Sequence, residues 1–94
     1  MSERMDEDLV LDGNAAAGLL REVFGAEMTA ALGACDGCGT TAAVGSLVAY
    51  TRAPGVVLRC RACGEVMVRI AQTARGTFVD VRGTRHIRIP SGTT

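Results

Sequence analysis

The apolar and polar positions near the start of the chain follow a helical period. Between residues 12 and 25, apolar residues recur at the spacing of one α-helical stripe: Ala16, Leu19, Leu20, Val23 and Phe24. Asp12 is a suitable N-cap for this helix, and Gly25 is a suitable end. We therefore expect one amphipathic helix over about 12–25, which covers the core or docks on a partner.

The rest of the chain has the period of two that is typical of β-strands. Residues 66–71 alternate in this way, and Ile87 and Ile89 continue the pattern near the end of the chain. Two further apolar runs flank the segment RAPG, in which Pro54-Gly55 fits the centre of a type II turn. The pattern predicts antiparallel β-hairpins after the helix.

These elements indicate one small α+β domain over 11–89. The acidic residues 1–10 are expected to form a flexible lead, and residues 90–94 a flexible tail. The chain has 94 residues with two Phe, one Tyr and no Trp, so large core side chains are scarce. A core of this size supplies a net stability of only about 3–5 kcal/mol, and small domains add disulfides or a metal. The four cysteines are the candidates for such a cross-link.

The cysteines form two C-x-x-C pairs, Cys35 and Cys38 in CDGCG and Cys60 and Cys63 in CRACG. Two intervening residues let both sulfurs of a tight turn face one ion, so two turns provide four thiolates in a tetrahedron. A glycine follows each pair, where it permits positive φ and lets backbone N–H groups point at the sulfurs. The spacing predicts one structural Zn²⁺, with the hairpins over about 27–83 forming a zinc ribbon.

Three other uses of cysteine pairs stay open. A rubredoxin-like iron site has the same ligands and would make the protein an electron carrier. A thioredoxin-like dithiol needs a helix behind the pair, whereas CGTTAAVGS and CGEVMVRI have the composition of strands or loops. Disulfides are rare in the cytosol, and the acidic start MSERMDEDLVLDG does not match a signal peptide. No segment approaches the roughly 18 apolar residues of a membrane span, so we expect a cytoplasmic protein.

Charge is unevenly distributed along a chain of zero formal net charge. Residues 1–36 carry eight acidic residues and two arginines, a net charge of −6, whereas residues 37–94 carry eight arginines and two acidic residues, a net charge of +6. This asymmetry predicts either internal pairing of the two segments or an interaction surface. The arginines on or beside the expected ribbon strands are Arg52, Arg59, Arg61, Arg69, Arg75, Arg82, Arg85 and Arg88.

Two classes of partner fit this distribution. Arginine contacts with phosphate, with Tyr50 and Phe78 to stack on bases, would give salt-sensitive binding of nucleic acid. A pI near 6.5 is low for a dedicated nucleic-acid domain. We therefore expect a protein–protein adaptor first and a nucleic-acid-binding ribbon as the alternative. Arg59 and Arg61, which bracket Cys60, would also compensate the negative charge of a zinc tetrathiolate.

The sequence does not point to an enzyme or to a small-molecule substrate. A zinc ion held by four thiolates has no open position for water or substrate. The only histidine, His86, lies in the basic tail with no adjacent Cys or Ser that would suggest a nucleophile–base pair. No glycine-rich phosphate loop of the Walker or Rossmann type is present.

With both cysteine pairs placed, the chain resembles the zinc-ribbon (rubredoxin-like) group. More narrowly, LDGNAAAGLLREVFGAEMT followed by CDGCG, RAPG and CRACG resembles a family of short actinobacterial proteins of unknown function. The resemblance covers about Leu11 to Arg82. It implies a helix plus zinc ribbon with Cys35, Cys38, Cys60 and Cys63 as ligands, and it implies no assigned activity.

Overall fold

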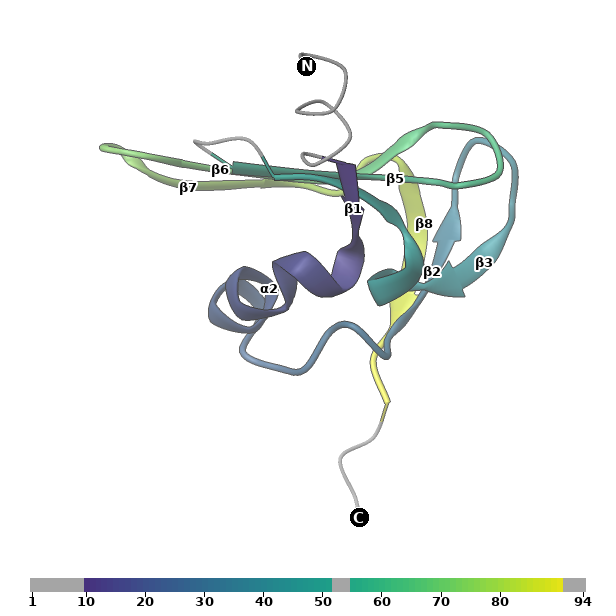
Figure 1. Cartoon of the computed structure of the whole chain (residues 1–94), viewed down its shortest axis with the longest axis horizontal. Helices are drawn as coiled ribbons and strands as arrows, with labels where there is room; N and C mark the ends of the chain where they lie inside the picture. The colour runs from purple at the N-terminus through teal and green to yellow at the C-terminus, as the bar shows by residue number, and fades with distance from the viewer. Residues whose placement is uncertain (1–9, 52–54, 91–94) are drawn as a thin grey trace.

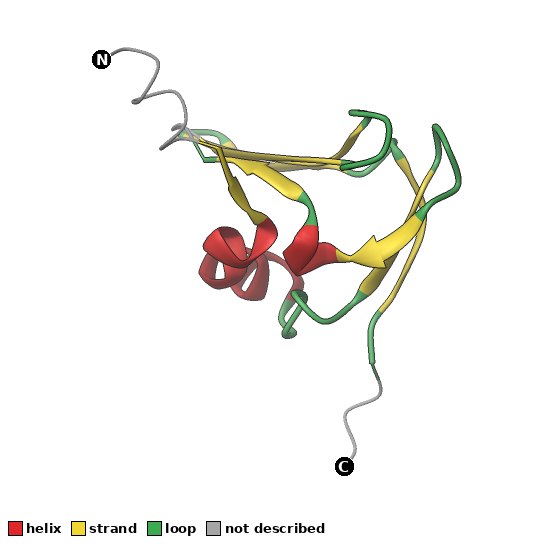
Figure 2. Ribbon diagram, turned by 45° about the vertical axis from the view of Figure 1, so that its right-hand side comes forward, coloured by secondary structure: helices red, strands yellow, loops and turns green. Residues whose placement is uncertain are grey.

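The fold combines one short helix with two antiparallel sheets (Figures 1 and 2). A computed structural model describes residues 10–51 and 55–90. In chain order the elements are β1 (Val10–Asp12), the 3-10 helix η1 (Gly13–Ala16), α2 (Ala17–Phe24), β2 (Leu32–Cys35), β3 (Thr41–Ala43), the 3-10 helix η2 (Val44–Ser46), β4 (Val48–Tyr50), β5 (Gly55–Arg59), β6 (Val66–Thr73), β7 (Gly76–Asp80) and β8 (Thr84–Arg88).

The helical segment is split into a 3-10 turn and an α-helix. Asp12 caps η1, because its side chain accepts a hydrogen bond from the backbone N–H of Asn14. Gly25 ends α2 in the left-handed conformation at φ 72°. The sequence predicted one continuous helix over about 12–25, but the first turn is 3-10 where Gly13 packs closely against the backbone of Val44.

The larger sheet has the strand order β1-β4-β5-β6-β7. Ala49, Leu58 and Val68 lie opposite one another on its inner face and are buried, together with Leu20 of α2, in one core cluster. The apolar stripe of the helix is therefore used for the core. Side chains alternate between the two sides of a strand, so the next row of residues lies on the opposite side of the sheet. The successive cross-strand neighbours in this row are Tyr50, Val57, Arg69 and Asp80. We call this side the outer face.

The smaller sheet has the order β3-β2-β8. The hairpin of β2 and β3 was expected, but the pairing of β8 with β2 joins residues about fifty positions apart and was not. β8 lies beyond the expected ribbon segment of about 27–83 and pairs with β2, the strand that ends at Cys35. The turn at Pro54 lies outside the described residues, as do residues 1–9 of the expected lead over 1–10 and residues 91–94 of the expected tail over 90–94. Val10, the last residue of that lead, instead belongs to β1. Among those described, no helix is long and apolar enough to cross a membrane.

Candidate metal centre

Each cysteine pair lies in the turn of a β-hairpin. Cys35 ends β2 and Cys38 precedes β3, whereas Cys60 and Cys63 lie between β5 and β6. The two turns are close together at the end of the molecule opposite the tip of the β6–β7 hairpin (Figure 1). A strand, not a helix, follows each pair, as the sequence suggested. This arrangement lacks the helix N-terminus that lowers the pKa of a thioredoxin-like thiol.

The two turns have the same backbone hydrogen bonds. The N–H groups of Gly37 and Ala62 each donate to the sulfur of the cysteine two residues earlier, at 3.3 Å. The N–H groups of Gly39 and Gly64 each donate to the carbonyl of the first cysteine in the pair, at 2.9 Å. The amides that donate to sulfur, those of Gly37 and Ala62, orient the thiolates and partly neutralise their charge.

Gly39 and Gly64 occupy the conformation that the sequence predicted. Their φ values are 81° and 84°, in the left-handed region that glycine enters without steric cost. A β-carbon at Gly64 would meet no atom within 4 Å, so only the backbone conformation restricts this position. The repeated glycine is therefore a requirement of the turn and not of the packing around it.

The four sulfur atoms converge on one point. All of them lie within 4.8 Å of one another, and two close contacts join the two turns: 3.6 Å between Cys35 and Cys63, and 3.7 Å between Cys38 and Cys60. Ligand sulfurs about 2.3 Å from a tetrahedral ion are about 3.8 Å apart, so the spacing fits one metal ion. Cys35 and Cys60 are buried, whereas Cys38 and Cys63 are exposed. The sequence-predicted ligands are thus brought together as a set able to hold a metal.

Without a metal, the thiols differ in how easily they ionise. Thr40 lowers the pKa of Cys38 to about 6, because its hydroxyl, 3.1 Å from the sulfur, and its backbone both stabilise the thiolate. The backbone N–H of Glu65 lowers the pKa of Cys63, but partial desolvation of the thiol and the three neighbouring sulfurs together outweigh it and raise that pKa to about 12. Four adjacent thiols resist losing all their protons because the resulting thiolates repel one another, and a bound cation would offset this repulsion.

A short turn, residues 81–84, holds the two cysteine turns against each other. The backbone N–H of Asp36, in the first turn, donates to the carbonyl of Gly83 at 2.8 Å. A side chain at Gly83 would collide with the carbonyl of Val66, which lies just beyond the second turn. Arg85 adds an ion pair with Asp36 at 3.5 Å. Sequence reasoning missed Gly83, and the position of this glycine before the final strand was the only local signal for it.

The described arginines have different partners. Arg61 donates to the carbonyl of Ser46, and Arg82 forms an ion pair with Asp80 at 2.7 Å, which lowers the pKa of that carboxyl to about 2. Arg59 donates to the carbonyl of Gly64 and lies over the ring of Tyr50, 5.5 Å from its centre. Arg52 lies outside the described residues.

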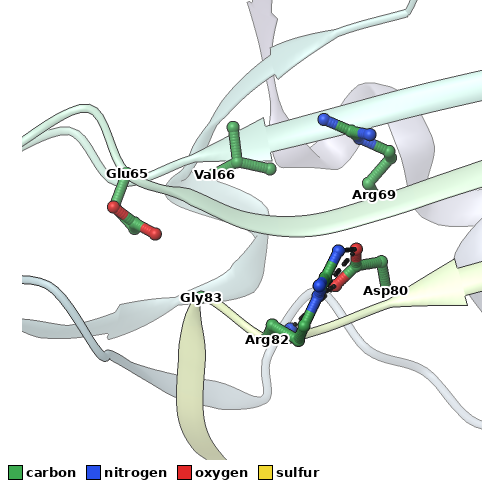
Figure 3. Close-up of a pocket in the computed structure, with 6 residues that line it drawn as sticks. All are labelled: Glu65, Val66, Arg69, Asp80, Arg82 and Gly83. Carbon is green, nitrogen blue, oxygen red and sulfur yellow. Dashed lines mark hydrogen bonds and ion pairs between the residues drawn. The ribbon is translucent and has the colours of Figure 1, made fainter.

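Arg69 lines a hollow beside the second cysteine turn (Figure 3), together with Glu65, Val66, Asp80, Arg82 and Gly83. The Asp80–Arg82 pair lies at one end of this hollow, and Glu65 at the other. His86, exposed on β8, lies opposite Ala34.

These features define a small α+β protein with a four-cysteine cluster able to hold a metal. The chain belongs to a family of unknown function (DUF6510), whose model matches residues 4–92. No curated protein matches the chain, and no solved structure matches it. Family membership therefore comes without an assigned process or partner.

Proposed function

We propose that this is a non-enzymatic cytoplasmic protein whose four cysteines bind one structural Zn²⁺ and whose sheet is a protein-binding module. The observation that carries the zinc assignment is the convergence of four sulfurs from two equivalent turns, each with an N–H donor to a sulfur. Zinc accepts four thiolates and is redox-silent, which suits a cross-link between two hairpins. A rubredoxin-like iron site has the same ligand set and is the competing assignment.

The absence of catalysis follows from the same coordination. Four protein thiolates complete a tetrahedral shell, so neither water nor substrate reaches the ion. The chemistry of the site is then structural: it joins the β2–β3 hairpin to the β5–β6 hairpin. Metal binding in small domains contributes on the order of 10 kcal/mol to folding, which exceeds the net stability of a small core.

The binding role is supported by a hollow on the outer face. Tyr50, Val57, Ala71 and Arg69 contribute to its lining, which is almost entirely apolar. Arg59 lies over Tyr50 on the same face. No described element covers this face, since α2 packs on the other side of the sheet (Figure 1). An apolar hollow flanked by arginines suits a protein segment with an apolar anchor side chain and acidic neighbours.

The metal assignment is tested on the purified full chain. Elemental analysis should find one zinc per chain, and a strong chelator should abolish the circular dichroism spectrum of the folded protein. A red, redox-active preparation would transfer the assignment to iron. A chain that contains no metal and keeps its fold in chelator would refute the metal site altogether.

The binding role is tested by partner capture from cells with matched variants. Val57→Asp places a charge in the hollow and should abolish capture of the partner, whereas Ile89→Asp, an equal change at an exposed site away from the hollow, should preserve it. Both variants should retain zinc. Equal capture by the two variants would refute a docking site in the hollow.

Nucleic acid is the second candidate, and the Arg59–Tyr50 contact favours it. A guanidinium stacked over an aromatic ring is a common element of single-strand binding surfaces. Retention of single-stranded DNA or RNA that falls steeply between low and high salt, and falls further in Arg69→Ala, would support this candidate. Arg88→Ala, on the smaller sheet, is the matched control. No retention at low salt would exclude nucleic acid.

A further inference from the structure

The two sheets have exposed edges that differ in how they are protected against pairing with another strand. Sheet edges are commonly protected by short strands or by charged side chains. In the described part of the chain, β1 and β3 have three residues each, and β8 carries Arg85 and Arg88. The remaining edge, β7, has five residues, Gly-Thr-Phe-Val-Asp, and contains neither a basic residue nor a proline. Its one charged side chain, that of Asp80, is at its last residue and is paired with Arg82, so β7 is the least protected edge among the described strands.

Apolar side chains are exposed along this same edge. Phe78 is 59% exposed and Val79 is 43% exposed, on opposite faces of the strand. Val81, directly after β7, is 38% exposed. Large apolar side chains that lie together at a free strand edge gain stability when another strand covers them.

The hairpin geometry decides which backbone groups of β7 are free. The β6–β7 turn has two residues, so Thr73 and Gly76 form the closing hydrogen-bonded pair. Hydrogen-bonded and non-hydrogen-bonded pairs then alternate, and Phe78 and Asp80 bond to β6 through Ala71 and Arg69. The N–H and C=O groups of Thr77 and Val79 therefore point away from β6, toward the free edge.

We propose that β7 pairs in antiparallel fashion with β7 of a second copy of this chain, forming a dimer with a continuous sheet. The free groups of Thr77 and Val79 lie symmetrically about Phe78. A two-fold axis at Phe78 therefore pairs Thr77 with the partner subunit's Val79, and Val79 with the partner subunit's Thr77. Phe78 then lies directly opposite the partner's Phe78, where aromatic side chains in adjacent strands stabilise each other.

The charges on β7 permit this self-pairing. Asp80 is the only ionisable residue of the strand, and Arg82 already neutralises it. In the symmetric register Asp80 lies opposite the partner subunit's Gly76, so like charges do not face each other. The dimer contact is formed by the edge of β7 and not by the apolar hollow on the outer face. The dimer proposal therefore does not depend on the proposed adaptor role.

The test measures the mass of the zinc-loaded full chain by analytical ultracentrifugation over a wide range of concentration. The wild type should reach twice the mass of one chain. Val79→Pro removes an N–H that points outward but none that bonds to β6, and edge strands tolerate such a proline. Phe78→Glu instead places two like charges at the axis. Both variants should stay monomeric with unchanged zinc content, whereas Ile89→Glu, which removes an exposed apolar residue elsewhere, should dimerise like the wild type.

Amide hydrogen exchange gives a second readout that is specific to the register. The amides of Thr77 and Val79 should exchange rapidly at low concentration and slowly in the dimer, whereas the amide of Phe78 should be protected at both concentrations. A wild type that is monomeric throughout would overturn the proposal. So would a dimer unaffected by Phe78→Glu, or a monomer whose β7 amides become protected only with a foreign protein.

Discussion

The hydroxyl of Thr84 donates a hydrogen bond to the carbonyl of Met67 at 2.7 Å and so joins the two sheets. Thr84 is the first residue of β8, and Met67 lies in β6, where the pairing with β5 shifts register. Both residues lie close to the cysteine turns: Thr84 is the cross-strand neighbour of Cys35, and Met67 follows the turn that holds Cys63. This bond therefore helps to hold the two halves of the metal centre in place.

Replacement of Thr84 by valine should destabilise the protein. The substitution keeps the shape of the side chain but leaves the Met67 carbonyl without this donor, which costs about 1–3 kcal/mol when the group is shielded from water. Chemical denaturation of the zinc-loaded protein measures the change in the free energy of unfolding. Thr84→Ser retains the hydroxyl and should recover most of the loss, and equal effects of both variants would contradict the role of the bond.

Replacement of Cys60 by serine should unfold the region that contains both hairpins. Cys60 is 4% exposed, and its loss removes one of four sulfurs together with the acceptor for the N–H of Ala62. Zinc content and circular dichroism measure the result, and binding of one zinc with an unchanged spectrum would contradict it. His86→Ala is the control, and it should change neither measurement because His86 is exposed on β8.

Two glycine-to-alanine substitutions should have opposite effects. At Gly64, φ is 84° and alanine should cost about 1–2 kcal/mol of stability, because a β-carbon disfavours the left-handed region. At Gly18, an exposed helical position with no atom within 4 Å of the added carbon, alanine should add up to about 1 kcal/mol. Thermal unfolding of the zinc-loaded variants compares them, and changes of the same sign would contradict the assignment.

Acid release of zinc should depend on Thr40. Protons compete with metal for thiolates, so zinc affinity falls as the pH falls. The pKa of Cys38 is lowered from 9.0 to about 6. Its sulfur therefore stays ionised and ready to bind metal above about pH 6, and it becomes protonated as the pH falls through that value. Thr40→Val removes the hydroxyl, so the pKa of Cys38 should rise and zinc should be released at a higher pH than in the wild type.

A zinc-sensitive dye measures this release during an acid titration. Thr41→Val changes the next residue in the same way but removes no hydrogen bond to a sulfur, and it should leave the midpoint of release unchanged. A midpoint that is the same in Thr40→Val and in the wild type would show that the Thr40 hydroxyl does not set the acid sensitivity of the site.

The sequence by itself determined the features that depend on a few neighbouring residues. The cysteine turns follow from C-x-x-C-G, because the glycine permits the positive φ and the short spacing directs both sulfurs inward. The end of the helix at Gly25 and the buried positions of its stripe follow from capping and from the helical period. These interactions lie within one helix or one turn, so the local sequence is sufficient to predict them.

Only the tertiary structure decided which distant strands meet. The pairing of β8 with β2 and of β1 with β4 joins segments that share no local pattern, and the free energy that selects them comes from packing across the whole core. The same holds for Gly83, which matters only because both hairpins lie against it: Asp36 of one donates to its carbonyl, and the Val66 carbonyl of the other leaves no room for a side chain. Strand periodicity says which residues face inward, but an edge strand such as β7 becomes an edge only when every other pairing has been made.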